Sequence, residues 1–91
     1  MHGFDWDVAK AWSNERKHGV SFEEAASVFF DWGEVTRSDP RHSTNEERFV
    51  TIGVSVRDRL LVVVHADHDD EIRIISARPA TRLERLIYEE D

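Results

Sequence analysis

The chain has 91 residues, no cysteine and a formal net charge of −7. A chain of this length supports one hydrophobic core, so residues 1–91 are interpreted as a single domain. The composition excludes disulfide bonds and thiolate metal sites, lacks the apolar run of ~20 residues that crosses a membrane, and opposes non-specific binding to nucleic acid. We therefore expect a cytoplasmic protein with no membrane contact.

Two short helices are predicted in the N-terminal third. Residues 4–7 alternate apolar and acidic side chains, as a short strand or a helix cap does, and Asp7 is a plausible N-cap for a helix over residues 8–17. Within that helix Val8, Ala11 and Trp12 lie on one face at helical spacing, and Lys10, Asn14 and Lys17 lie toward another. A second helix is predicted to begin after Ser21 and to end near residues 31–33.

Strands are predicted for the middle of the chain. They cover residues 34–38, 48–54, 59–66 and 71–78, which are rich in β-branched side chains and joined by short connections. Short connections make neighbouring strands antiparallel. The run Leu-Leu-Val-Val-Val at 60–64 is the most apolar, and a central position in the sheet, buried on both faces, is expected for it.

A last helix is predicted from residue 80 to about residue 89, with Pro79 at its first turn. Its apolar residues Leu83, Leu86 and Ile87 are expected to pack on the sheet. The order of two helices, several strands and one helix predicts an α+β fold with a twisted antiparallel sheet of about four strands.

The chemistry indicated by the sequence centres on arginines and one histidine. His65 follows the most apolar strand, and residues 37–85 contain nine arginines and no lysine. Guanidinium groups suit planar recognition of phosphate, and an imidazole near them can support metal-independent cleavage of a phosphodiester. In a regular strand Arg73 and Arg78 would point to opposite faces. Each strand arginine is equally compatible with pairing to a neighbouring carboxylate.

Two further clusters allow alternative interpretations. Residues 65–70 contain two histidines and three aspartates, which are ligand types that zinc or manganese accepts, but an Asp-rich turn is also typical of a solvated hairpin. Lys17 and His18 could reach the same site as His65, or they could simply neutralise the carbonyl groups at the end of the first helix.

Several segments together resemble the BrnT family of toxins. They are Phe-Asp-Trp-Asp at 4–7, Lys-His-Gly-Val-Ser-Phe at 17–22, Glu-Glu-Arg-Phe at 46–49, Leu-Val-Val-Val-His at 61–65 and Arg-Ile-Ile-Ser-Ala-Arg at 73–78. The resemblance extends over nearly the whole chain in the same order. It implies a RelE-like fold with two N-terminal helices, an antiparallel sheet and one C-terminal helix.

The resemblance also implies a function. A BrnT toxin is the ribonuclease of a type II toxin–antitoxin pair; it would cleave RNA without a metal ion or other cofactor and inhibit translation. A BrnA-type antitoxin would neutralise it, and DNA would be bound only indirectly, through that antitoxin. By position, the candidate catalytic residues are His65, Arg48 and Arg78, and the candidate RNA-binding residues are Lys17, His18, Arg73 and His68.

The chain departs from the family pattern after the strand histidine. His68 occupies a position that is usually arginine, and the surrounding residues 67–71 are strongly acidic. Negative charge beside a phosphate site opposes RNA binding. The alternative function is therefore a catalytically weak or inactive homologue that serves as an antitoxin-binding module.

Overall fold

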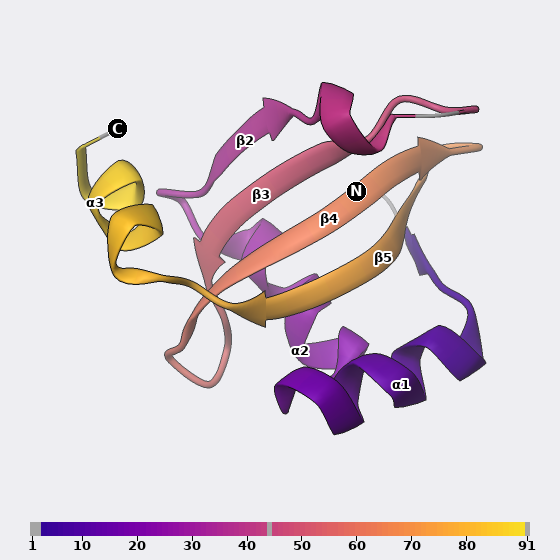
Figure 1. The fold of residues 1–91 in the computed structure, drawn as a ribbon, viewed down its shortest axis with the longest axis horizontal. Helices are drawn as coiled ribbons and strands as arrows, with labels where there is room; N and C mark the ends of the chain where they lie inside the picture. Colours follow the sequence, from indigo (N-terminus) through magenta and orange to yellow (C-terminus); the bar gives the residue numbers. More distant parts are fainter. Residues whose placement is uncertain (1–2, 44, 91) are drawn as a thin grey trace.

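The computed structural model describes residues 3–43 and 45–90, which form a five-stranded sheet and its helices (Figure 1). The spatial order of the strands is β1-β5-β4-β3-β2, so β4 is central as expected, and the α+β class is confirmed. The strands are β1 (Gly3–Asp5), β2 (Val35–Ser38), β3 (Phe49–Val54), β4 (Leu60–His68) and β5 (Glu71–Pro79). The helices are α1 (Val8–His18), α2 (Phe22–Ser27) and α3 (Arg82–Glu90), with 3-10 turns at Val28–Phe30 and Pro40–His42.

The sheet has one strand more than the sequence predicted, and it is mixed. β1 pairs with β5 in parallel, whereas the other neighbours are antiparallel. Residues 4–7 supply both structures that were considered for them, because β1 ends at Asp5 and the Asp7 carboxylate accepts a hydrogen bond of 3.0 Å from the backbone N–H of Lys10. This bond satisfies a free donor in the first turn of α1.

The β4–β5 hairpin is tighter than expected. β4 continues to His68, and only Asp69 and Asp70 form the turn, with φ of 50° and 66°. Two consecutive positive φ angles define a turn whose twist matches the strands on either side, and aspartate tolerates this conformation. The acidic segment is therefore half strand and half turn.

The main core lies between the sheet and α2. Leu61 and Val63 of β4 are fully buried against Phe22 and Ala25 of α2. In Figure 1, α2 lies behind the sheet and α1 runs below β5. Ser21 followed three residues later by Glu24 is the sequence of a capping box, but in α2 this box is incomplete. Ser21 caps the helix, whereas the Glu24 carboxylate is buried and accepts hydrogen bonds from the side chains of Ser55 and Arg59.

α1 lies along the edge of β5, and its buried residue is polar. The apolar side chains of Val8 and Trp12 are 62% and 70% exposed, whereas Asn14, predicted on another face of the helix, is buried. The Asn14 side chain donates to the carbonyl of Ala77 at 2.8 Å and accepts from its N–H at 3.0 Å. The amide thus supplies hydrogen-bond partners to the backbone of β5 at a point where no strand of the described chain lies beside it.

Replacing Asn14 with alanine is expected to lower the free energy of unfolding by roughly 2 kcal/mol, because it leaves buried backbone groups without partners. These groups include the carbonyl of Val20, which also accepts from Asn14. Urea denaturation measures the change, and Ser13→Ala at the exposed neighbouring position is the control. Equal stability of both variants and the wild type would show that Asn14 does not support the edge.

The opposite face of the sheet is only partly covered. α3 packs near a small cluster formed by Ile52, Leu60 and Val62, with Ala80 and Tyr88 against it. The expectation for the rest of α3 is wrong, because its apolar residues Leu83, Leu86 and Ile87 are exposed. Figure 1 shows α3 at one end of the sheet. Within the described residues, no helix is long and apolar enough to span a membrane.

Candidate functional site

Arginines surround an apolar floor on the sheet face opposite α2, which we call the open face. Residues directly opposite each other on antiparallel strands share a face. Arg48 lies one residue before β3, and its carbonyl accepts a hydrogen bond from the backbone N–H of Asp39, so the pairing of β3 extends one residue beyond Phe49 to Arg48. Three rows of cross-strand partners make up the open face. The row nearest α3 contains Val35, Ile52, Val62 and Arg78, and the middle row contains Arg37, Val50, Val64 and Ser76. The third row contains Arg48, Ala66 and Arg73.

A bulge in β5 brings Arg73 and Arg78 to the same face. Val64 pairs with Ser76 and His65 pairs with Ile74, so Ile75 has no partner on β4. The extra residue shifts the alternation of side chains by one. The alternation of a regular strand therefore does not hold between the two arginines, and Arg78, whose direction next to Pro79 the sequence leaves open, lies on the face of Arg73.

Arg48 and Arg73 form the cationic end of the open face. The Arg73 guanidinium donates to the Glu46 carboxylate at 2.6 Å, and both side chains are about one-third exposed. Within the described part of the chain, the Nε atoms of Arg48 and Arg73 are buried and have no acceptor. Two guanidinium groups with unsatisfied donors at one place favour an anionic ligand.

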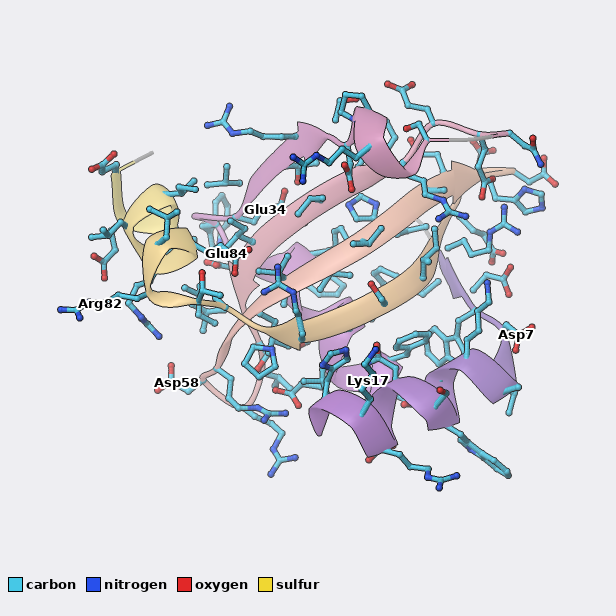
Figure 2. All side chains as sticks on the ribbon, viewed as in Figure 1. Asp7, Lys17, Glu34, Asp58, Arg82 and Glu84 are labelled. Atoms are coloured by element: carbon cyan, nitrogen blue, oxygen red, sulfur yellow. The ribbon has the colours of Figure 1, made fainter. Side chains whose placement is uncertain are left out.

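Arg78 binds α3. Its guanidinium donates two hydrogen bonds, of 2.8 and 2.7 Å, to the carboxylate of Glu84. These bonds lower the pKa of Glu84 to about 2 and raise that of Arg78. Figure 2 shows Glu84 on the side of α3 that faces the sheet, while Arg82 points away from it. Arg78 therefore holds the first turn of α3 in this state.

His65 lies in the core on the α2 side, away from the arginines. It is 4% exposed, and its ring centroid lies 4.8 Å from Phe29, edge to face, and 5.8 Å from Phe49, stacked. The structure therefore does not bring His65 together with Arg48, Arg73 or Arg78. Burial lowers the pKa of His65 to about 4, against the attraction of Asp67.

A chain of hydrogen bonds across three strands determines the tautomer of His65. Glu34 accepts from the Thr36 hydroxyl at 2.8 Å, Thr36 contacts Thr51 at 2.7 Å, and Thr51 contacts Nε2 of His65 at 2.7 Å. Since Thr36 uses its single hydrogen on the carboxylate, Thr51 must donate to Thr36, and Nε2 must donate to Thr51. Nδ1 is therefore the unprotonated nitrogen, and it is buried without a partner in the described chain.

His68 is the imidazole on the open face. It lies two residues beyond Ala66 on β4, pairs with Glu71, and is half-exposed. His65 and His68 point to opposite faces, so they are not positioned to bind one metal ion. Across residues 3–43 and 45–90, no group of three or more His, Asp or Glu side chains is arranged to hold a metal.

Lys17 and His18 lie at the edge of β5. They line a shallow hollow with Lys10 and Asn14 of α1 and with Ser76 of β5, and Figure 2 shows Lys17 at the end of α1 below β5. Ser76 belongs to the middle row of the open face, so these two residues flank that face at the edge of the sheet.

Two residues of the site were missed by sequence reasoning. Arg37 lies on the open face in the row of Val50, and a period-two count from Val35 would have found it. Glu46 binds Arg73 from the loop before β3, and no pattern in the sequence indicates that contact. Together the residues form a small α+β protein with a cationic, partly covered sheet face suited to an anionic polymer.

Comparison with known proteins agrees with this class. Residues 6–84 match the family model described as "Ribonuclease toxin, BrnT, of type II toxin-antitoxin system". The chain therefore belongs to the BrnT family of ribonuclease toxins, whose type II systems include an antitoxin partner. A crystal structure of the Brucella abortus ribonuclease toxin BrnT superposes with a TM-score of 0.60 at 23% identity, covering 90% of this chain and 100% of that one. No curated protein matches.

Proposed function

We propose that the protein is a metal-independent ribonuclease that cleaves RNA on the open face and thereby inhibits translation in the cytoplasm. The observation that carries this proposal is the bulge in β5, which gathers Arg73 and Arg78 with Arg48 around a floor that α3 covers only in part. The proposed neutralising partner is a BrnA-type antitoxin, with DNA bound only through that antitoxin.

The reaction we propose needs no group from outside the chain. The ribose 2′-oxygen attacks the adjacent phosphorus while its proton passes to a base, and the bond from phosphorus to the 5′-oxygen breaks as that oxygen takes a proton. Arg48 and Arg73 would stabilise the negative charge that increases on the phosphate oxygens. His68, on the same face, would take the proton from the 2′-oxygen and return it to the 5′-oxygen.

His65 takes a different place in this proposal. Its ring is in the core on the other side of β4 and would reach RNA only if the core opened. We assign it a positioning role. Its ring contacts Phe49 and Thr51 and so supports β3, the strand that directly follows Arg48 in the chain. Lys17 and His18 would bind RNA at the edge of β5.

A specific observation favours the alternative of a weak or inactive toxin. Glu46 and Glu84 already occupy the guanidinium groups of Arg73 and Arg78, so an RNA phosphate must replace a carboxylate at both positions. The carboxylates of Asp67 and Glu71 add negative charge at the cationic end. A homologue of this kind would bind its antitoxin without cleaving RNA.

Purified protein is expected to cleave single-stranded RNA in excess EDTA, leaving 2′,3′-cyclic phosphate and 5′-hydroxyl ends. Gel analysis of a labelled RNA and mass spectrometry of its fragments measure both the rate and the ends. The double variant Arg48→Gln/Arg73→Gln, purified identically, controls for contaminating nucleases. An inactive wild type that still forms a complex with the antitoxin would reject the ribonuclease and support the binding module.

A further inference from the structure

The exposed side of α1 carries an aromatic and basic surface that the fold does not use. Ala9, Trp12, Ser13, Arg16 and Lys17 line a hollow on this side, which we call the α1 platform. Trp12 is 70% exposed although it is one of the largest side chains in the protein. Since the described structure buries α1 through Asn14 and not through Trp12, the fold gives no reason for an indole at this position.

The charge of the α1 platform is opposite to that of the protein. The last turn of α1 contains Arg16, Lys17 and His18 and no acidic residue in the last three positions, while the whole chain has a net charge of −7. At 100° per residue, Glu15 lies beyond Trp12 on the side away from Lys17. An anionic partner is therefore attracted to this helix even though most of the protein repels it.

The α1 platform is continuous with the open face. Lys17 lines both the α1 platform and the hollow at the edge of β5. That second hollow reaches Ser76, whose partner across the sheet is Val64 on the floor of the open face. A path therefore leads from the floor over the edge of β5 to Lys17, then to Arg16 and Trp12.

We propose that the α1 platform binds a single-stranded segment of the RNA substrate that flanks the cleaved bond. One base would stack on the Trp12 indole, and Arg16 and Lys17 would contact the phosphates that lead to it. Stacking on an aromatic ring beside a basic track is how single strands are bound without sequence preference. A duplex would keep its bases stacked on one another and leave the indole unused. This inference rests on the proposed ribonuclease function.

The test uses two 2′-O-methyl oligoribonucleotides, which bind but lack the attacking hydroxyl: a trimer and a dodecamer. Fluorescence anisotropy measures their affinities for the full-length protein. Trp12→Ala and Arg16→Gln are each expected to weaken dodecamer binding about ten-fold and to leave trimer binding unchanged, because a trimer at the open face does not reach α1. Trp32→Ala and Arg82→Gln replace exposed residues of the same types elsewhere and should change neither affinity.

A second readout reports contact directly. In a Trp32→Phe background the remaining tryptophan fluorophores are Trp12 and Trp6, and Trp6 packs against the core. The dodecamer is expected to quench their emission, a duplex of the same length is expected to quench it less, and replacing Trp12 with phenylalanine in this background is expected to abolish the quenching. Dodecamer binding that Trp12→Ala leaves unchanged would overturn this inference and keep the proposed function, whereas a wild type that binds neither oligomer would overturn both. Loss of antitoxin binding by Trp12→Ala, with RNA binding intact, would assign the α1 platform to the protein partner and also overturn the proposal.

Discussion

Replacing Arg48 or Arg73 with glutamine is expected to lower kcat/KM for RNA cleavage by roughly 10²- to 10³-fold, since removing one donor that stabilises transition-state charge has an effect of that size. Both guanidinium groups lie at the end of the open face, and both have a buried Nε without an acceptor in the described chain. Initial rates on a labelled RNA in EDTA, at several substrate concentrations, separate the effect on kcat from that on KM. A loss confined to KM would indicate binding without catalysis.

Arg82→Gln is the matched control for both variants. Arg82 is exposed and points away from the sheet in Figure 2, so its loss removes the same charge from a surface outside the proposed site. The thermal unfolding midpoint of all three variants should stay close to that of the wild type, because each replaced side chain is at least partly exposed. Cleavage that Arg48→Gln and Arg73→Gln leave at the wild-type rate would remove these residues from the mechanism.

Lowering the pH from 6.5 to 4 is expected to reduce the free energy of unfolding by roughly 3 kcal/mol through His65. Burial holds its pKa in the folded protein at about 4, compared with 6.5 for the free side chain. Above pH 6.5 both states are neutral and His65 has no effect. Below it the unfolded chain takes up the proton and the folded protein does not, so stability is lost as the pH falls. Urea denaturation at a series of pH values measures this loss.

The control for this prediction removes the titrating group. His65→Gln keeps an N–H donor for Thr51 but has no proton to gain, so its stability should fall less over the same pH range, and the difference between the two slopes isolates His65. The titration of carboxylates contributes equally to the pH dependence of stability in both proteins. Should the variant fail to fold, NMR titration of the wild-type imidazole still decides, since a midpoint near 6.5 would contradict a buried, neutral His65.

The fold class was predictable because local patterns agree with the tertiary structure. β-branched residues define β3, β4 and β5, and Gly19, with a φ of 71°, ends α1 as a glycine there should. The parallel pairing of the short β1 was not predictable, because its partner, β5, is distant in sequence. The packing predicted for α3 was wrong because helical periodicity cannot show whether an apolar stripe is covered, and for the same reason it did not show which side of α1 meets the sheet.

For the candidate site, the sequence identified the residue types but not their arrangement. Arg73 and Arg78 were singled out as candidates, but the bulge that aligns them depends on the pairing of β5 with β4. His65 was chosen because it follows the most apolar strand. It lies on the same face of β4 as Leu61 and Val63, as the alternation of side chains along a strand requires. What alternation cannot reveal is that α2 covers that face.

The bulge at Ile75 has a consequence for variation in this segment. Four residues separate Arg73 from Arg78, and they bring both side chains to one face only because one of the four has no partner on β4. Gain of a single residue between them would turn one arginine toward the core, where a charge cannot remain unpaired. Loss of the unpaired residue would instead leave a regular strand with both arginines still on one face. Substitutions that preserve packing would leave both arginines in place. An insertion in this segment is therefore expected to disturb the open face more than such a substitution does.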